Sequence, residues 1–409
     1  MHYAASEVFR HRNCKEFLRR RERNTNAIIE EDMSRYILLT GATGNIGARL
    51  VVDLLKDGAI ERIVLLVRGA SDDHARWRAV QIIEETAQGL LPFDWQDRIM
   101  VLAGDVTREQ MGLSISNYDE LIHRVTHIIH SAAATSFVQS SREALKNNYD
   151  GTVNVMRLAE QCHELGRLES VGHVSTAYVN APNNGTIGEN RLTHRHEFFN
   201  HYELSKWAAE QYVRSMTDTL PVMIFRPSIV LGDSITGYTS AFNVAYQPIK
   251  YICCDQACWL PGAGETLLDM VPADYVVASI LRIFSRQANC GRTFHIVAGQ
   301  KNSISCERFV YAIHNYLQSR GLSAGTVRFE SGACLPELHN RLPGHIRRVY
   351  RILRIFSPYI TNNWTFDDSN TREALRFSGI KCQHPGTYLD TILDFCLRTN
   401  WGKKIKKTA

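Results

Sequence analysis

Long apolar runs are absent from this sequence of 409 residues. None of its segments approaches the roughly 20 apolar residues that a membrane-spanning helix requires. The first residues, MHYAASEVFRHRNCKEF, also lack the continuous apolar stretch of a secretory signal peptide. We therefore expect a soluble protein with a cytoplasmic location.

Cysteine is too sparse to build a disulfide scaffold. The chain has 10 cysteines, and no two of them are spaced as a CxxC pair. The densest group, Cys253, Cys254 and Cys258, has no His or Cys partner at a zinc-binding spacing. We expect reduced, mostly buried thiols and no metal site.

The chain also lacks a large excess of one charge, since 47 Lys and Arg against 42 Asp and Glu give a net charge of +5. The surplus lies at the two ends. Residues 1–25 carry a surplus of +4, and Lys403, Lys404, Lys406 and Lys407 add another +4, which leaves −3 for the residues between. A nucleic-acid binder would need a basic face on its folded domain, so we exclude that class. The basic ends are suited either to peripheral contact with an anionic membrane or to solvated tails.

What the sequence does contain is a regular alternation of short β-rich runs and helical stretches. Hydrophobic residues make up 44% and charged residues 22%, as in ordinary globular domains. The expected strands are Tyr36–Thr40, Arg62–Arg68, Ile99–Ala103, His127–Ser131, Ser170–Ser175, Val222–Arg226 and Thr293–Val297. The expected helices between the first six strands are Ile46–Lys56, Asp72–Thr86, Tyr118–His123, Arg142–Glu164 and Tyr202–Met216. This alternation predicts βαβ units and a parallel sheet covered by helices on both faces.

A glycine-rich turn follows the first expected strand. The segment LLTGATGNIG, residues 38–47, spaces three glycines as GxxGxxG between a strand and a helix. Such a turn brings backbone without Cβ atoms, and the free N–H groups of a helix N-terminus, against a pyrophosphate. In this context the pattern indicates dinucleotide binding. The residues assigned to the cofactor here are Gly41, Thr43, Gly44, Asn45, Ile46 and Gly47.

The end of the second expected strand indicates which dinucleotide is bound. NAD sites place Asp or Glu about 20 residues beyond the glycines, where it holds the ribose 2′-hydroxyl. Here Arg68 stands 21 residues after Gly47, and Arg78 follows on the next helix. Two cations are suited to a 2′-phosphate, although a solvated strand-end arginine is the alternative. We therefore expect NADPH as the cofactor.

A third motif, YELSK, places Tyr202 and Lys206 four residues apart on one helix face. Thr176 lies 26 residues before Tyr202, at the end of an expected strand. We expect Tyr202 to act as a general acid and base. Its unperturbed pKa is near 10, and we expect Lys206 and the nicotinamide to lower it towards neutrality.

These motifs predict an α/β fold, namely a Rossmann-type doubly wound parallel sheet with a smaller, mainly helical C-terminal substrate-binding subdomain. We expect a basic N-terminal extension at 1–33 and an NADP-binding domain at 34–234. Residues 235–409 would form the substrate-binding region, with 266–300 returning to the sheet.

The chain resembles the extended short-chain dehydrogenases/reductases and, among them, the thioester reductases. These are the reductase domains of carboxylic acid reductases and non-ribosomal peptide synthetases, together with the fatty acyl-CoA reductases. The glycine turn and YxxxK mark the superfamily, whereas the Arg68–Arg78 segment, the GLS…YDEL…HSAA stretch and VPADYV point to the thioester reductases. The matching segments cover about residues 35–285. They are TGATGNIG, LLVRGASDDHARWR, AGDVT, GLSISNYDELIHRVTHIIHSAAATSF, NNYDGTVNV, HVSTAYVN, YELSKWAAE, FRPSIVLGDSITG and LPGAGETLLDMVPADYVVASI.

The resemblance implies a role for several residues. Thr176, Tyr202 and Lys206 occupy the positions of the catalytic hydroxyl, acid and lysine, and Asn148 that of a supporting Asn or a structural helix residue. The further cofactor positions are Asp105 and Val106 beside the adenine, Ala132 and Ala133 along the cofactor, and Pro227 and Ser228 beside the nicotinamide.

The implied reaction is NADPH-dependent reduction of an acyl thioester to an aldehyde, and in a second round to the alcohol. The thioester would be an acyl-CoA or an acyl or peptidyl chain on a carrier protein, and residues 305–360 show no pattern that decides between them. Residues 235–265 and 305–360 are expected to form an acyl-binding lid. Its expected apolar side is Leu335, Leu338, Leu342, Ile346, Val349 and Leu353. Its expected phosphate-binding residues are Arg341, Arg347, Arg348, Arg351 and Arg354.

Three other interpretations stay open. One is another extended reductase, dehydrogenase or epimerase acting on a sugar nucleotide or a hydroxylated lipid. The second is a non-catalytic NADP-binding sensor, against which the intact Tyr202–Lys206 pair argues. The third is a membrane-docking protein that uses the basic ends and the Arg347–Arg354 segment, which is compatible with catalysis.

Overall fold

The structure is a computed structural model. It describes residues 35–180, 185–190, 192, 198–242, 245–254, 259–330, 347, 349 and 353–403. The expected basic extension and most of the basic tail lie outside these residues. Within the described ranges, no helix has the length and apolar character needed to cross a membrane.

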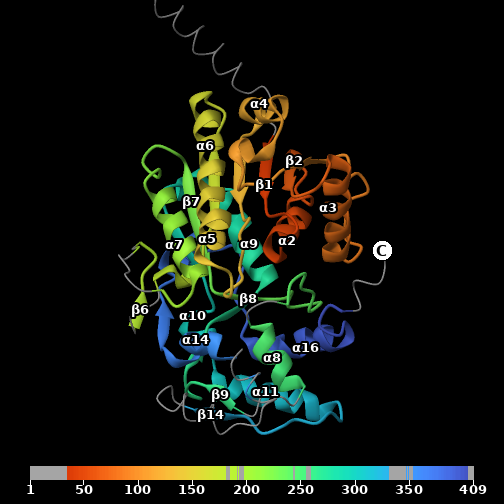
Figure 1. Ribbon diagram of the computed structural model, residues 1–409, viewed down its shortest axis with the longest axis vertical. Helices are drawn as coiled ribbons and strands as arrows, with labels where there is room; N and C mark the ends of the chain where they lie inside the picture. Colours follow the sequence, from red (N-terminus) through yellow and green to blue (C-terminus); the bar gives the residue numbers. More distant parts are fainter. Residues whose placement is uncertain are drawn as a thin grey trace, which may run out of the picture.

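Seven parallel strands form the central sheet in the order β12-β7-β5-β4-β1-β2-β3 (Figure 1). They are β1 (Arg35–Thr40), β2 (Ile60–Val67), β3 (Ile99–Ala103), β4 (His127–His130), β5 (Ser170–Val174), β7 (Val222–Pro227) and β12 (Thr293–Ile296). Each falls on a run of residues predicted to be a strand. The strand order reverses between β1 and β4, and ligands of such sheets bind beyond the carboxyl ends of the strands at that reversal.

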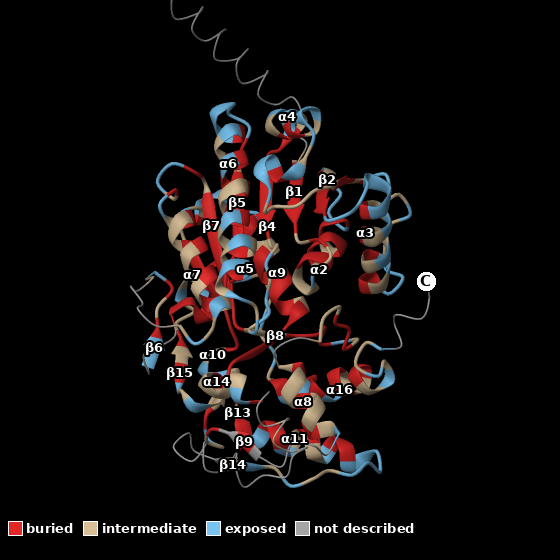
Figure 2. Cartoon of the chain, viewed as in Figure 1, coloured by how far each residue is buried: buried red, intermediate tan, exposed pale blue. Residues whose placement is uncertain are grey.

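Helices cover both faces of this sheet. Alternate residues of β1 point to opposite faces, because side chains alternate along a strand. Ile37 and Leu39 pack in one core with α2, α3 and α9, whereas Tyr36 and Leu38 pack in another with α4, α6 and the end of α7. Both cores consist of buried hydrophobic residues, and most residues of the strands between them are buried (Figure 2). The helices are α2 (Asn45–Leu54), α3 (Asp72–Ala87), α4 (Ile115–Arg124), α5 (Ser141–Leu145), α6 (Gly151–Glu164), α7 (His201–Arg214) and α9 (Ala273–Phe284).

The helix predicted over Arg142–Glu164 is present, with one π-helical turn at Lys146–Asp150 between α5 and α6. The sequence did not predict this turn. Such π-bulges often occur at functional sites.

Several segments of the C-terminal half form a smaller body, the C-terminal body, below the sheet in Figure 1. Its core joins Tyr246 of α8 (Tyr246–Cys253), Ile313 and Leu317 of α11 (Cys306–Ser319), and Ile392 of α16 (Leu389–Arg398). Its other helices are α10 (Gly299–Asn302) and α14 (Ser357–Thr361). Short strands complete it, namely β8 (Ile229–Leu231), β9 (Trp259–Pro261), β10 (Leu267–Leu268), β11 (Met270–Pro272), β13 (Ile304–Ser305) and β14 (Arg328–Glu330).

One late segment returns to the edge of the large sheet, which the sequence did not predict. Strand β15 (Trp364–Phe366) pairs with β6 (Gly185–Ile187), and α15 (Ser369–Ala374) packs beside β12. The contact centres on Glu189, which is 1% exposed. Its carboxyl group accepts hydrogen bonds from the backbone N–H groups of His295 at 2.8 Å and Asn370 at 2.6 Å. Burial raises the pKa of Glu189 to about 7, although these two hydrogen bonds act to lower it.

A pair of buried histidines in β4 and β5 makes stability sensitive to acid. The rings of His130 and His173 lie 5.5 Å apart, and neither ring nitrogen of His173 has a partner among the described residues. Burial, Lys206 and His130 together hold the pKa of His173 well below 6.5. Below pH 6.5, His173 therefore becomes protonated in the unfolded chain but stays neutral in the native protein. The free energy of unfolding then falls as the pH falls.

We expect His173→Leu to remove this penalty. Between pH 7 and pH 5 the variant should gain about 2 kcal/mol of unfolding free energy relative to wild type, at 1.36 kcal/mol per pH unit below 6.5. Urea unfolding at both pH values measures the difference. Glu189, whose pKa is raised, contributes to stability with the opposite pH dependence, but it does so equally in wild type and variant and cancels in the difference. If the unfolding free energies of the two proteins changed in parallel with pH, the prediction would be contradicted.

Candidate active site

A cavity of about 330 Å³ lies at the carboxyl ends of β1, β4, β5 and β7. It runs from the glycine turn before α2 to the first turns of α7, with one wall from the C-terminal body. The predicted residues that line it are Gly44, Asn45, Ile46, Gly47, Ala133, Thr176, Tyr202, Lys206, Pro227 and Ser228. Residues that the sequence did not single out also line it, namely Ser131, Thr135, Phe137, Val174, Ser175, Tyr178, Ile229, Val230, Ala241, Tyr246 and Tyr359.

The glycine turn is built for close backbone contact with an anion. Gly41 has a φ of +78°, and a Cβ there would lie 2.6 Å from the backbone nitrogen of Ala132. A Cβ on Gly47 would collide with the carbonyl oxygen of Gly41. Helix α2 begins at Asn45 with Gly44 as its N-cap, with no side-chain cap and no acidic residue in its first turn. Its N-terminal N–H groups and dipole therefore face the cavity and fit a pyrophosphate.

The other predicted cofactor residues surround this turn without lining the cavity. Arg68 is exposed directly after β2, and the guanidinium of Arg78 donates to its carbonyl oxygen. Asp105 accepts a hydrogen bond from the N–H of Thr107 at 2.9 Å. The predicted residues outside the cavity lining are Gly41, Thr43, Arg68, Arg78, Asp105, Val106, Ala132 and Asn148.

Three polar side chains converge on the opposite end of the cavity. Tyr202 and Lys206 come from the first two turns of α7, and Thr176 follows β5. The hydroxyl of Thr176 donates to the carbonyl oxygen of Pro227 at 3.5 Å and lies close enough to the phenol of Tyr202 to affect its pKa. The ammonium of Lys206, 2% exposed, donates to the carbonyl oxygen of Val174 at 2.7 Å. Thr176 and Tyr202 thus stand together where a substrate oxygen can meet both hydroxyls.

In the protein alone, the pKa of Tyr202 is raised. Burial raises it to about 12, the neighbouring Thr176 hydroxyl opposes the rise, and the charge of Glu203 adds to it. Burial also lowers the pKa of Lys206 to about 8, although Glu210 opposes this. The lowering expected from Lys206 and the nicotinamide together concerns the protein with bound cofactor and stays a prediction. A phenol protonated at neutral pH is the form that donates a proton during a reduction.

Asn148 supports the site from behind. It lies in the π-helical turn and is 1% exposed. Its side-chain oxygen accepts from the N–H of Ala134 at 2.7 Å, and its amide nitrogen donates to Ser205 Oγ at 2.8 Å. Asn148 therefore ties the loop after β4 to the catalytic helix α7, and does not itself reach the cavity.

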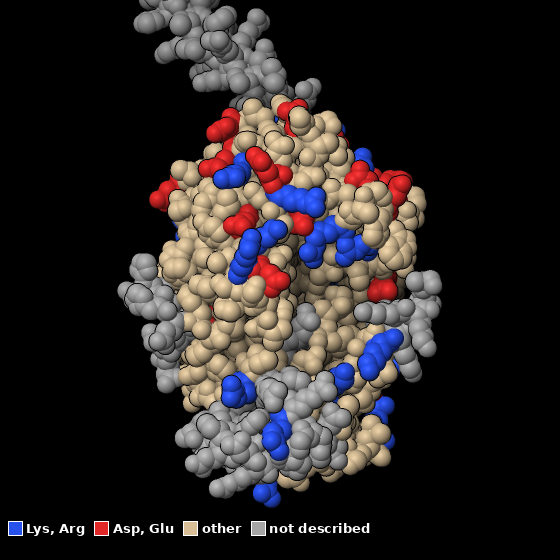
Figure 3. All heavy atoms as spheres, in the orientation of Figure 1, with Lys and Arg blue, Asp and Glu red and all other residues tan. Residues whose placement is uncertain are grey.

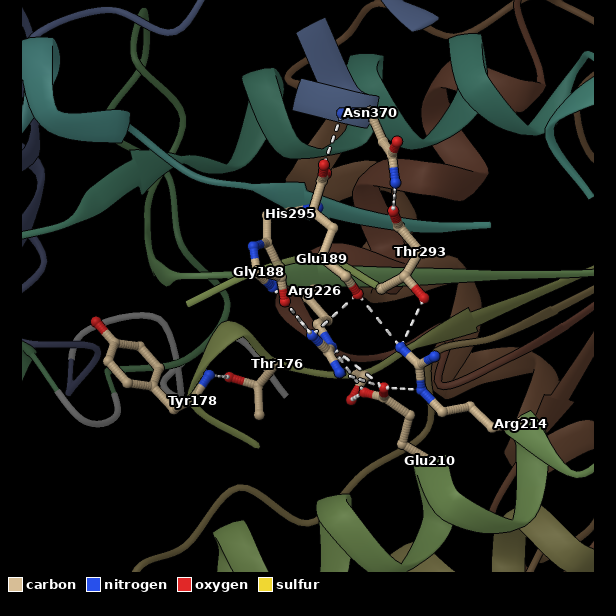
Figure 4. A network of polar contacts seen from close by, with 11 residues as sticks. Thr176, Tyr178, Gly188, Glu189, Glu210, Arg214, Arg226, Thr293, His295 and Asn370 are labelled. Carbon is tan, nitrogen blue, oxygen red and sulfur yellow. Dashed lines mark hydrogen bonds and ion pairs between the residues drawn. The ribbon is translucent and has the colours of Figure 1, made fainter. Parts of the chain in front are cut away.

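A buried charge network lies close to Thr176, between α7 and β7 (Figure 4). Glu210 and Arg226 are both 0% exposed and form an ion pair at 2.6 Å. Arg214 adds a second ion pair to Glu210 at 2.8 Å, and the hydroxyl of Ser175 donates to Glu210 at 2.6 Å. These cations hold the pKa of Glu210 at about 2 despite its burial. The network fixes α7 against β7 and the Ser175–Thr176 loop.

The C-terminal body contributes Tyr359 to the cavity wall. The hydroxyl of Tyr359 donates to the buried carboxylate of Glu203, the neighbour of Tyr202, and accepts from the amide of Asn200 at 2.8 Å. Its ring stacks on Phe137 at 5.5 Å. Tyr359 lies in the 305–360 segment that was expected to form part of the lid, but it stands 156 residues after Glu203, so no local pattern could have singled it out.

Curated relatives of the chain include reductases and peptide synthetases. It is 28% identical over 282 residues to the nonribosomal peptide synthetase asaC of Aspergillus flavus, covering 64% of this chain and 26% of that protein. It is 28% identical to the aldehyde reductase lnaA of the same species, and the match covers 89% of this chain and 35% of that protein. It is 26% identical to the putative fatty acyl-CoA reductase CG8306 of Drosophila melanogaster, and the match covers 71% of this chain and 64% of that protein. The chain thus spans about a quarter to a third of the first two relatives.

Solved structures share the fold over nearly the whole chain. The terminal R domain from the myxalamid PKS-NRPS biosynthetic pathway has a TM-score of 0.76 and 26% identity, covering 90% of this chain and 91% of that one. UDP-glucuronic acid 4-epimerase from Bacillus cereus has a TM-score of 0.62 at 17% identity, covering 89% and 98%, which is a likeness of fold alone.

These findings confirm the resemblance inferred from the motifs. The sequence pattern of the Male sterility protein family matches residues 39–280, more than half of the chain, and the chain belongs to this family.

Proposed function

We propose that this protein is an NADPH-dependent reductase that converts an acyl thioester to an aldehyde. The observation that carries the proposal is that two features line the same cavity. A glycine turn suited to an anion lies at one end, and Thr176, Tyr202 and Lys206 lie at the other. Relatives named as peptide synthetases, an aldehyde reductase and a fatty acyl-CoA reductase support the same reaction class.

Thr176, Tyr202 and Lys206 have different roles in the proposed reduction. Bound NADPH would supply the hydride to the thioester carbonyl carbon. Thr176 and Tyr202 donate hydrogen bonds to the carbonyl oxygen as negative charge develops on it, and Tyr202 transfers its proton there. The resulting hemithioacetal loses its thiol as the C–S bond breaks, which leaves the aldehyde. Lys206, fixed by Val174, keeps a positive charge beside Tyr202 while the phenolate exists.

The carrier of the thioester also belongs to the proposal. On the face drawn in Figure 3, the charged side chains visible on the lower, C-terminal third are Lys and Arg. Such a surface suits the phosphates of CoA or of a phosphopantetheinyl carrier protein. Arg347 and Arg354 are described, whereas Arg341, Arg348 and Arg351 lie outside the described residues.

A substrate panel tests the function. NADPH oxidation should occur with acyl-CoA or acyl-carrier thioesters and with free aldehydes, but not with UDP-sugars. Turnover of a UDP-sugar alone would favour the alternative sugar-nucleotide enzyme, and cofactor binding without turnover of any of these would favour a sensor.

We expect a preference for NADPH over NADH that depends on Arg68. Because a charge-assisted contact with the 2′-phosphate would be lost, Arg68→Ala should weaken NADPH binding by about 1–3 kcal/mol and leave NADH binding unchanged. Fluorescence titration of both cofactors measures this. Arg76→Ala, on helix α3 eight residues after Arg68, is the control, since the guanidinium of Arg76 donates to the carbonyl oxygen of Gln96. Equal affinity of the wild type for both cofactors would contradict the assignment.

A further inference from the structure

Tyr359 of the C-terminal body touches both segments that carry the proposed catalytic hydroxyls. It lies in α14 and lines the catalytic cavity, and only 8% of its surface is exposed. One of the two segments is the first turn of α7 with Tyr202, and the other is the loop after β5 with Thr176. Both belong to the large sheet and its helices, whereas Tyr359 comes from a distant part of the chain.

The hydroxyl of Tyr359 is held at the start of α7. It accepts a hydrogen bond from the side-chain amide of Asn200 at 2.8 Å and donates one to the carboxyl group of Glu203. Asn200 is the N-cap of α7, and its side-chain oxygen accepts from the N–H of Glu203 at 3.0 Å. The carboxyl group of Glu203 also accepts from the N–H of Phe199 at 3.3 Å. Tyr359 therefore closes a ring of hydrogen bonds on the first turn of α7, the turn that contains Tyr202.

The Tyr359 hydroxyl is suited to act as this donor. Burial and the charge of Glu203 hold the pKa of Tyr359 well above 10, so the hydroxyl keeps its proton at neutral pH. Glu203 is 0% exposed, and a buried carboxyl group depends on its hydrogen bonds. Burial raises the pKa of Tyr202, and the charge of Glu203 adds to the rise. A donor to Glu203 thus bears on the proton of Tyr202 as well as on its position.

The ring of Tyr359 contacts the second segment. It meets the ring of Tyr178 edge-on, with the two centroids 5.1 Å apart. The backbone N–H of Tyr178 donates to the hydroxyl of Thr176 at 3.4 Å, a contact drawn in Figure 4. The ring of Tyr359 also stacks on Phe137, whose ring centroid lies 5.8 Å from that of Tyr202. One side chain thus packs against the neighbours of both hydroxyls.

We propose that Tyr359 is a positioning residue that sets the first turn of α7, and with it the Tyr202 hydroxyl, against Thr176. The inference rests on the proposed function, in which both hydroxyls meet one substrate oxygen. The C-terminal body then does more than enclose the substrate, because the catalytic site is complete only with Tyr359 in place. A residue that merely forms the cavity wall affects substrate binding, whereas a positioning residue affects the rate at which the bound complex reacts.

Tyr359→Phe tests this role, because it removes the hydroxyl and keeps the ring. With decanoyl-pantetheine and with decanal, kcat should fall about tenfold or more, since a small displacement of a catalytic group is costly in rate. The KM of each substrate should stay within about twofold of wild type. Tyr388→Phe is the matched control, because Tyr388 is a buried tyrosine of the same body whose hydroxyl donates to the carbonyl oxygen of Met270, away from the catalytic cavity. The control should keep the wild-type kcat, and an unchanged kcat in Tyr359→Phe, with or without a raised KM, would overturn the inference.

Backbone amide exchange follows the start of α7 without any turnover. The N–H groups of Glu203 and Leu204 are bonded to the side-chain and carbonyl oxygens of Asn200. In the NADP⁺-loaded protein, these two amides should exchange about tenfold faster or more in Tyr359→Phe than in wild type, because the ring of hydrogen bonds is open. They should be unchanged in Tyr388→Phe. Amides in the last turn of α7 should be unchanged in both variants, which separates local release from a general loss of stability. Wild-type exchange at the first turn in Tyr359→Phe would overturn the inference.

The two measurements separate this inference from the proposed function. If the wild type reduces neither substrate but the exchange difference is found, the proposed reaction fails and the positioning of α7 by Tyr359 stands. If the wild type reduces both substrates and Tyr359→Phe matches it in kcat and in exchange, the positioning role fails and the proposed function is kept.

Discussion

Tyr202→Phe should lower kcat for thioester and aldehyde reduction by about a hundredfold or more, the usual scale of a lost general acid. The substitution removes only the hydroxyl that meets Thr176, so the fold and the affinity for NADPH should be kept. Stopped-flow NADPH oxidation under saturating substrate measures the loss, and cofactor fluorescence measures the affinity.

Tyr212→Phe provides the matched control for this experiment. It removes a hydroxyl from the same helix α7, at a residue that does not line the cavity, and should leave kcat unchanged. Lys206→Ala should impair both turnover and NADPH affinity, because it removes the buried cation. Full activity in Tyr202→Phe would mean that the site performs other chemistry.

The largest loss of stability is expected from Arg226→Met. This change leaves the carboxylate of Glu210 buried without its closest cation, and breaking a buried ion pair in this way costs about 3–5 kcal/mol. Urea unfolding at pH 7 measures the change. Since the pKa of Glu210 is held at about 2, its favourable contribution is present above its unfolded pKa of 4.5 and is lost as pH falls towards 2.

An exposed ion pair offers the comparison. Arg372 pairs with Asp368 at 3.2 Å, but its side chain is 69% exposed, so Arg372→Met should change stability by about 0–1 kcal/mol. The double variant Glu210→Leu with Arg226→Met should recover part of the loss, because no unpaired charge then stays buried. If Arg226→Met lowered the free energy of unfolding no more than Arg372→Met does, this result would show that water reaches Glu210.

The parts of the fold that were predicted correctly are those with strong local signals. Strand residues such as Ile63–Val67 are apolar on both faces, and only a strand buried between two helical layers requires this. The glycine turn and the Tyr202–Lys206 spacing are equally local, since each depends on one turn of backbone. These signals, together with the family resemblance that assigned Ala133, Pro227 and Ser228, brought ten of the predicted residues to one cavity.

The features that were missed depend on distant or cooperative effects. Tyr359 reaches the site from α14, and the carboxylate of Glu189 meets α15, in both cases through contacts between residues far apart in sequence. The effect of burial on the pKa of Tyr202 was also missed, because a sequence shows which charges are nearby but not how much water is excluded. The domain boundaries and the catalytic roles remain predictions.

The contact between Glu189 and Asn370 also bears on how the chain folds as it is made. The two residues are 181 positions apart, so at a synthesis rate of about 5–20 residues per second the partner of Glu189 emerges roughly 10–40 s later. During that interval β6 has no β15 to pair with, and once β12 has been made the edge of the sheet lacks the cover of α15. The nascent protein therefore presents an open sheet edge until α15 has left the ribosome, and this edge is where chaperones would act and where aggregation would begin.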